Sequence, residues 1–177
     1  MEEDIVHTLL RLDILEGKSN VNLDELSTLL LDNYSKRLGE NPSNSRYEDS
    51  YCPPSPLVDQ VAKEMINSFK RYSGLHIHTK DYWGHIHEKN MSTNAHDHIG
   101  ADVSSVLYVS VPEGSGSIVF KPRPDPSDSG FLSKEFPPKE GTFYMFPSYL
   151  EHYVTRNQSD KKRISISFNF KKGIANE

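Results

Sequence analysis

The chain has 177 residues, the size of one ordinary domain, and it is long enough to bury a core without the help of disulfides. Its net charge of -5 argues against a general nucleic-acid-binding protein, and its single cysteine, which cannot form an internal disulfide, favours a reducing, cytoplasmic location. The N-terminus is acidic where a secretory signal would be basic, and no apolar run approaches the ~18 residues of a membrane helix, so we expect no membrane association.

Two helices are predicted in the first part of the chain. Leucines recur near helical spacing after Asn22, which suits an N-cap, and this helix is expected to end near Gly39. A loop rich in Asn, Ser and Pro follows, and Ser55 and Pro56 then predict the start of a second helix that ends at Gly74. We expect both helices to form a layer over the rest of the domain, with homodimerisation through their leucines as the alternative.

The spacing of apolar residues changes from a period of 3.6 to a period of 2 after Gly74, which predicts strands. The predicted strands are residues 76–78, 83–87, 103–111, 117–120, 142–146, 152–155 and 163–170. Several short strands without interleaved helices indicate a β-sandwich or barrel. We therefore predict one compact domain, in which a helical segment (residues 1–74) packs on a β core (residues 75–177).

A stretch rich in Pro and Ser, residues 121–140, interrupts the predicted strands. A loop of this length without secondary structure is typical of a lid or substrate-binding element, or else of a disordered segment. Phe131 and Leu132 are the apolar residues expected to close over a substrate if the stretch is a lid.

Six of the eight histidines fall in three His-x-His pairs, which are His76 and His78, His85 and His87, and His96 and His98. Residues i and i+2 of a strand share one face, so such a pair can provide two ligands to a metal and needs a third ligand from elsewhere. For any one pair taken alone, an exposed strand face is the more common explanation. We expect His76 and His78 to lie on the surface.

The strand predicted to begin at Arg163 has one polar face. Alternation places Arg163, Ser165 and Ser167 on one side and apolar residues on the other. If the polar side points into a barrel, the buried arginine must be paired, and a carboxylate ligand held by both arms of the guanidinium would satisfy it. The alternative is a solvated arginine beside Lys161 and Lys162.

Five stretches in the second half of the chain resemble the iron(II)- and 2-oxoglutarate-dependent dioxygenase superfamily, and in particular its group of 2OG-Fe(II) oxygenases related to the prolyl-hydroxylase-like branch. They are Trp83-Gly84-His85-Ile86-His87, His96-Asp97-His98 with Ser104-Ser105-Val106-Leu107-Tyr108-Val109, Val111-Pro112-Glu113-Gly114-Ser115-Gly116, Phe146-Pro147-Ser148-Tyr149-Leu150-Glu151-His152, and Arg163-Ile164-Ser165-Ile166-Ser167-Phe168-Asn169. The resemblance implies a mostly β fold with N-terminal helices, a double-stranded β-helix (jelly-roll, cupin-like) barrel. It also implies an enzyme that uses Fe(II), 2-oxoglutarate and O2 to hydroxylate a C–H bond, with succinate and CO2 as co-products.

The resemblance assigns His96 as the first metal ligand and His152 as the distal one. Most of the superfamily has a carboxylate where this chain has His98, although the group most similar to it tends toward histidine. Exchanging a carboxylate for an imidazole raises the charge of the site by one and removes an anionic donor to iron(II). Either three histidines hold iron, or the site has changed its metal to zinc or nickel, or has lost it. The arginine beside the site favours iron.

The resemblance also assigns Arg163 and Ser165 to a clamp for the far carboxylate of 2-oxoglutarate, with the Tyr108 hydroxyl as a further hydrogen-bond donor. Three residues on the strand before the metal motif are candidate cavity residues, with packing of the tryptophan and rim positions for the histidines as the alternative: Trp83, His85 and His87.

Two other functions compete with this hypothesis. A cofactor-free, three-histidine dioxygenase of cupin type would bind substrate directly to iron and would leave Arg163 without a role. A non-catalytic β-sandwich would use the histidines for a structural metal such as zinc. The substrate, a small molecule or a peptidyl residue, has no readable motif in the sequence.

Overall fold

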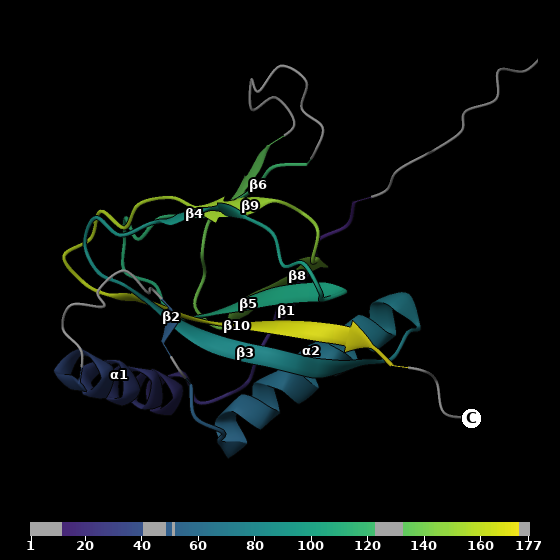
Figure 1. The fold of residues 1–177 in the computed structure, drawn as a ribbon, viewed down its shortest axis with the longest axis horizontal. Coiled ribbons are helices and arrows are strands. Elements are labelled where there is room, and N and C mark those ends of the chain that lie inside the picture. The colour runs from purple at the N-terminus through teal and green to yellow at the C-terminus, as the bar shows by residue number, and fades with distance from the viewer. Residues whose placement is uncertain (1–11, 41–48, 51, 123–132, 174–177) are drawn as a thin grey trace, which may run out of the picture.

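The computed structural model of the protein describes residues 12–40, 49–50, 52–122 and 133–173. Two antiparallel sheets face each other, and two helices cover the outer side of the larger sheet (Figure 1). The elements are β1 (Leu15–Lys18), α1 (Leu23–Glu40), β2 (Asp49–Ser50), α2 (Pro56–Ser73), β3 (Ile77–His87), β4 (Thr93–His96), β5 (Val103–Ser110), β6 (Ile118–Phe120), β7 (Lys134–Phe136), β8 (Thr142–Pro147), β9 (His152–Val154) and β10 (Arg163–Lys172).

The strand order is that of a jelly roll. The larger sheet runs β1-β8-β5-β10-β3-β2 and the smaller one runs β4-β9-β6-β7. Most neighbours in the order are not consecutive in the chain, so the chain crosses repeatedly between the two layers. The predicted mostly β fold with a double-stranded β-helix and N-terminal helices is thereby confirmed.

Both helices begin where the sequence predicts. The Asn22 side chain accepts a hydrogen bond from the backbone N–H of Glu25, and the Ser55 hydroxyl accepts one from the backbone N–H of Val58, as N-caps do. Gly74 ends α2 in the left-handed conformation, with φ of 72°. Among the described residues, no helix is long and apolar enough to cross a membrane.

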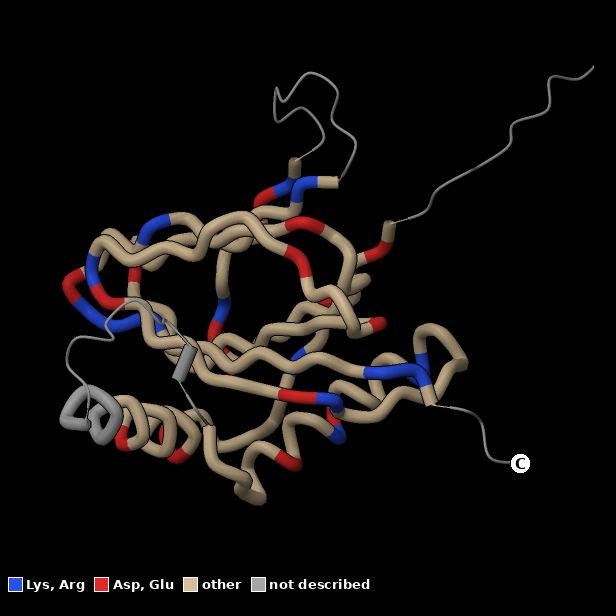
Figure 2. Tube along the Cα trace, in the orientation of Figure 1, with Lys and Arg blue, Asp and Glu red and all other residues tan. Residues whose placement is uncertain are grey.

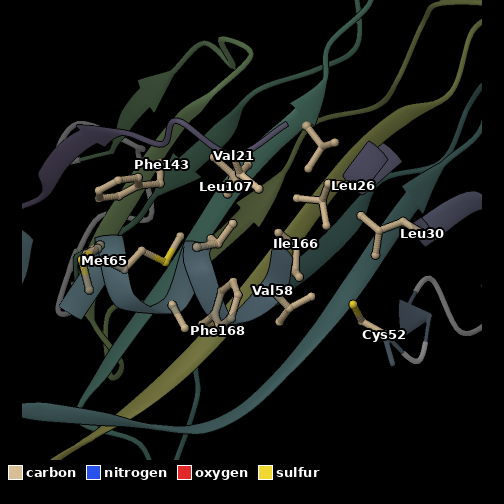
Figure 3. Close-up of a cluster of buried hydrophobic side chains, with 14 of the residues drawn as sticks. Val21, Leu26, Leu30, Cys52, Val58, Met65, Leu107, Phe143, Ile166 and Phe168 are labelled. Atoms are coloured by element: carbon tan, nitrogen blue, oxygen red, sulfur yellow. The ribbon is translucent and has the colours of Figure 1, made fainter. Parts of the chain in front are cut away.

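A hydrophobic core lies between the helices and the larger sheet (Figure 3). Leu26 and Leu30 of α1 are fully buried in it, and so is Met65 of α2. From the sheet side, Ile166 and Phe168 of β10 complete the cluster. The leucines of α1 therefore serve the helical layer, while homodimerisation stays a prediction.

The segment before residue 74 is not purely helical, in contrast to the prediction. β1 pairs with β8 at the edge of the larger sheet, and the two residues of β2 pair with β3. Position 17 of β1 requires glycine, because a Cβ there would come within 2.3 Å of the Phe143 ring. Strands of four and two residues are too short for their alternation to be recognised in the sequence. The division at residue 74 itself stays a prediction.

Two further elements differ from the prediction. The two strands expected around residues 76–78 and 83–87 are parts of one long strand, β3, because the polar residues between them also pair with β10. Within the predicted loop 121–140, β7 forms and pairs with β6. Phe131 and Leu132, the candidate lid residues, lie outside the described residues.

β10 connects the core to the space between the sheets because its two faces differ. Ile164, Ile166 and Phe168 point to the helices, whereas Arg163 and Ser165 point between the sheets. Elsewhere in the described chain, basic and acidic residues are interspersed on strands, loops and helices, with neither charge confined to one element (Figure 2). The electrostatics of the inner space therefore depend on a few buried groups.

Candidate metal and cosubstrate site

Three histidines converge at one end of the space between the sheets. His96 at the end of β4 pairs directly with His152 at the start of β9, and His98 follows two residues after β4. The ring centroids are 4.4 Å apart for His96 and His152, 5.0 Å for His96 and His98, and 5.1 Å for His98 and His152. One nitrogen from each ring lies within 4.8 Å of the others, which is the arrangement of a metal-binding group.

Main-chain carbonyls orient two of these rings. Nδ1 of His96 lies 2.8 Å from the carbonyl oxygen of Asn94, and Nδ1 of His152 lies 2.9 Å from that of Leu150. A carbonyl oxygen only accepts hydrogen bonds, so each Nδ1 carries the proton and each Nε2 keeps its lone pair. Because any residue can supply a carbonyl, these two partners could not be predicted from the sequence.

Burial keeps the imidazoles of His152 and His98 neutral. It lowers the pKa of His152 to about 3, although the hydrogen bond to Leu150 opposes the shift. Burial also lowers the pKa of His98 to about 4, with the charge of His96 as the next contribution. Neutral imidazole is the form that binds metals, so these groups fit a divalent cation.

The third histidine is held by a contact between two loops. The backbone N–H of His98 donates to the carbonyl of Ser148 at 2.9 Å, and the ring of His98 lies 5.4 Å from that of Trp83. Because β4 ends at His96, strand alternation does not itself bring His98 to the metal group. Asp97 is not part of the group of candidate ligands among the described residues.

Arg163 lies at the other end of the same pocket. Its residue exposure is 2%, so the alternative of a solvated arginine beside Lys161 and Lys162 is wrong. The guanidinium lies 5.5 Å from the centroid of the Tyr108 ring, and Nη2 donates to the Ser165 hydroxyl at 3.4 Å. The residues predicted for the carboxylate clamp are therefore adjacent.

Tyr108 contributes a buried hydroxyl to this end. The residue is fully buried, and its hydroxyl has no hydrogen-bond partner within the part of the chain that the structure describes. Burial raises the pKa of Tyr108, so the hydroxyl stays protonated and can donate. A buried hydroxyl without a partner is costly, which fits a site that a ligand oxygen completes.

The strand β3 places Trp83, His85 and His87 along one side of the pocket. The Trp83 indole Nε1 donates to Nε2 of His85 at 2.7 Å, and Nε2 of His87 lies 2.9 Å from the Thr93 hydroxyl. All three candidate cavity residues thus line the pocket, and Thr93 is a lining residue that sequence reasoning missed. Another histidine pair, His76 just before β3 and His78 within it, is exposed as predicted.

The pocket fits a small dianion next to a metal. Histidines, Arg163 and Tyr108 line this one pocket together. None of the described residues that line it is acidic, so Arg163 provides the charged side chain of the lining. A metal at the histidines and a carboxylate at Arg163 would satisfy both ends.

Comparisons with known proteins agree with this geometry. A family model described as "Putative 2OG-Fe(II) oxygenase" matches residues 81–169. No curated protein matches the sequence.

Solved structures share the fold at low sequence identity. A Pseudomonas putida prolyl-4-hydroxylase has 16% identity and a TM-score of 0.57 over 91% of this chain and 88% of that one. The viral collagen prolyl hydroxylase of Paramecium Bursaria Chlorella virus-1 has 14% identity and a TM-score of 0.60 over 97% of this chain and 100% of that one.

A third similar structure is the epimerase SnoN of nogalamycin biosynthesis in complex with Fe3+ and alpha ketoglutarate. It has 14% identity and a TM-score of 0.61 over 89% of this chain and 78% of that one. These structures establish the fold, and the family model covers half of the chain. The protein belongs to this family of 2OG-Fe(II) oxygenases, enzymes that use iron(II), 2-oxoglutarate and O2.

Proposed function

We propose that the protein hydroxylates a C–H bond of a small molecule or a peptidyl residue, with succinate and CO2 as co-products. The observation that carries this proposal is the pairing within one pocket of three converging imidazoles with a buried arginine. Imidazoles and a carboxylate clamp together suit a metal-chelated 2-oxo acid with a second carboxylate. A structural metal site would not need the clamp.

In this proposal His96, His98 and His152 hold iron(II) through one nitrogen each. The metal, when loaded with cosubstrate and O2, supplies the oxidising chemistry. The carbonyls of Asn94 and Leu150 keep Nδ1 of their histidines protonated, so that Nε2 points its lone pair at the ion. The protein thus contributes ligand orientation that exists before the metal binds.

Arg163, Ser165 and Tyr108 orient the cosubstrate from its distal end. Arg163 offers a charge-assisted pair of hydrogen bonds, and the Tyr108 hydroxyl adds a neutral one. Apolar side chains between the two ends, among them Val106 and Phe146, limit water in the pocket. Trp83, His85 and His87 line one side of the pocket. We place the protein in the cytoplasm on account of its single cysteine.

His98 gives the site one unit of charge more than the carboxylate it replaces. If His98 is a ligand, His98→Ala loses iron, whereas His98→Asp keeps iron and 2-oxoglutarate binding because it restores a donor. Iron content after anaerobic loading and desalting measures metal binding in both variants. Full iron content in His98→Ala would refute the three-histidine site.

Turnover in the presence of ¹⁸O2 tests the reaction. The proposal predicts that the iron-loaded enzyme converts 2-oxoglutarate to succinate that carries one ¹⁸O atom, slowly alone and faster with a substrate. Candidate small molecules and peptides are then screened for a mass gain of one oxygen atom. Consumption of O2 with substrate but without succinate would favour the cofactor-free dioxygenase instead.

A further inference from the structure

The pocket contains a pair of histidines on β3 that the metal group does not use. His85 and His87 line the same pocket as Arg163 and come from β3, the strand that pairs with β10 in the larger sheet. His87 is 1% exposed, and the two rings are nearly parallel, with an angle of 10° and a centroid distance of 5.9 Å. They form a flat wall on one side of the pocket.

We propose that His85 and His87 are cosubstrate-binding residues that hold the distal carboxylate of 2-oxoglutarate against Arg163. The inference rests on the proposed function and names residues that select the cosubstrate by its second carboxylate. It assigns them no part in metal binding.

The strand register supports this assignment. His87 is the partner of Arg163 and His85 is the partner of Ser165 in the pairing of β3 with β10. Side chains of directly opposite residues have Cβ atoms about 4.5–5.5 Å apart on the same face of a sheet. Each member of the clamp on β10 therefore has an imidazole beside it, within reach of any carboxylate that the clamp holds.

The hydrogen bonds orient the imidazoles. An indole Nε1 can only donate, so Nε2 of His85 must accept the bond from Trp83. In a neutral ring the proton of His85 then lies on Nδ1, which makes this nitrogen a donor. The contact of Nε2 of His87 with the Thr93 hydroxyl fixes the orientation of the His87 ring.

The charge state of the wall also suits a carboxylate held by an arginine. An acidic residue opposite Arg163 would compete with the cosubstrate, and a cationic one would repel the guanidinium. Burial, followed by the charge of Arg163, lowers the pKa of His87 to about 3. His87 is therefore neutral at physiological pH. A neutral imidazole can donate a hydrogen bond to the carboxylate without repelling the guanidinium.

The test compares two 2-oxo acids on anaerobic, iron(II)-loaded protein: 2-oxoglutarate, and 2-oxovalerate, which has a methyl group in place of the distal carboxylate. We expect His87→Phe and His85→Phe to weaken 2-oxoglutarate binding about tenfold each and to change 2-oxovalerate binding less than about twofold. The preference for the dicarboxylate then falls by the same factor. The charge-transfer band or the fluorescence of Trp83, the only tryptophan, reports binding.

Three further variants distinguish the loss of a direct contact with the carboxylate from a general distortion of the pocket. His78→Phe changes an exposed histidine of the same strand and should leave both affinities unchanged. His87→Asn keeps a donor and should recover part of the lost preference. Trp83→Phe removes the bond that fixes His85 and should cost about threefold for the dicarboxylate, measured by the charge-transfer band.

The outcomes distinguish this inference from the proposed function. Variants that bind iron and keep the wild-type preference for 2-oxoglutarate would overturn the inference and leave the proposed function intact. Equal weakening of both 2-oxo acids would also overturn it, because a distorted pocket does not distinguish them. Failure of the wild-type protein to bind 2-oxoglutarate would refute the proposed function together with the inference.

Discussion

The two ends of the pocket are built from different parts of the fold. At the metal end, His96 and His152 come from the smaller sheet and His98 from a loop, and only His152 is buried. At the arginine end, Arg163 and Tyr108 come from adjacent strands of the larger sheet, which the helices cover. The arginine end is thus deeply buried beside the core, whereas the metal end is only partly buried and is oriented by main-chain carbonyls. The two ends should respond differently to mutation.

Loss of a ligand at the metal end should have the largest effect. His152→Ala is expected to weaken iron(II) binding at least about 100-fold and to abolish 2-oxoglutarate binding with it, because the cosubstrate chelates the metal. Metal analysis after anaerobic loading measures the first effect and calorimetry the second. His76→Ala, at an exposed histidine, is the control. Stoichiometric iron in His152→Ala would show that the three histidines are not the metal site.

Loss of the arginine should affect only the cosubstrate. Arg163→Met fills most of the volume but removes the charge-assisted hydrogen bonds, so we expect about 100-fold weaker 2-oxoglutarate binding with iron content unchanged. Arg163→Ala should abolish cosubstrate binding. Lys161→Met, at an exposed residue, should change neither quantity. Retained cosubstrate affinity in both arginine variants would refute the clamp.

Acid should destabilise the metal-free protein through its buried histidines at both ends of the pocket, and His87 is the one at the arginine end whose share can be isolated. Because burial and the charge of Arg163 lower the folded-state pKa of His87 to about 3, the unfolded chain, with a histidine pKa near 6.5, binds the proton first. Stability is full above about pH 6.5 and falls by up to about 1.4 kcal/mol per pH unit below it from this residue alone. Denaturant midpoints at pH 7.5, 5.5 and 4.5 measure the slope. His87→Asn should reduce the slope by the contribution of this one residue, while His98 and His152 keep theirs. An equal slope in that variant would contradict the assignment.

The smallest effect should come from one hydroxyl. Tyr108→Phe removes a buried donor that has no partner among the described residues, so the free protein should be as stable as the wild type or slightly more so. The same change should weaken 2-oxoglutarate binding about fivefold, the cost of one neutral hydrogen bond. Thermal unfolding and titration measure the two effects. A destabilised variant with unchanged cosubstrate affinity would place the hydroxyl in the core instead.

The sequence predicted the parts of the site that depend on strand alternation. The period of two along β10 placed Arg163 and Ser165 on one face because every strand obeys it, and β3 aligned Trp83 with His85 in the same way. The caps of both helices were also readable, since their side chains act on adjacent backbone.

The rest of the site depends on contacts between distant segments. His98 lies beyond the end of β4 and reaches the metal group because a loop bond to Ser148 holds it there. The carbonyls of Asn94 and Leu150 act through the backbone, so their side chains give no signal. The resemblance to oxygenases assigned His96 and His152, whereas His98 stands where most of the superfamily has a carboxylate, so its role as a ligand stays a prediction.

We propose that one pocket holds iron(II) at three histidines and 2-oxoglutarate between that metal and Arg163. Anaerobic addition of iron(II) and then 2-oxoglutarate should produce the visible metal-to-ligand charge-transfer band of the chelate, and the band should be absent in His152→Ala. Iron binding without the band in the wild-type protein would contradict the claim and favour a cofactor-free, three-histidine site. Failure to bind iron would show that the histidine in place of the usual carboxylate has cost the site its metal.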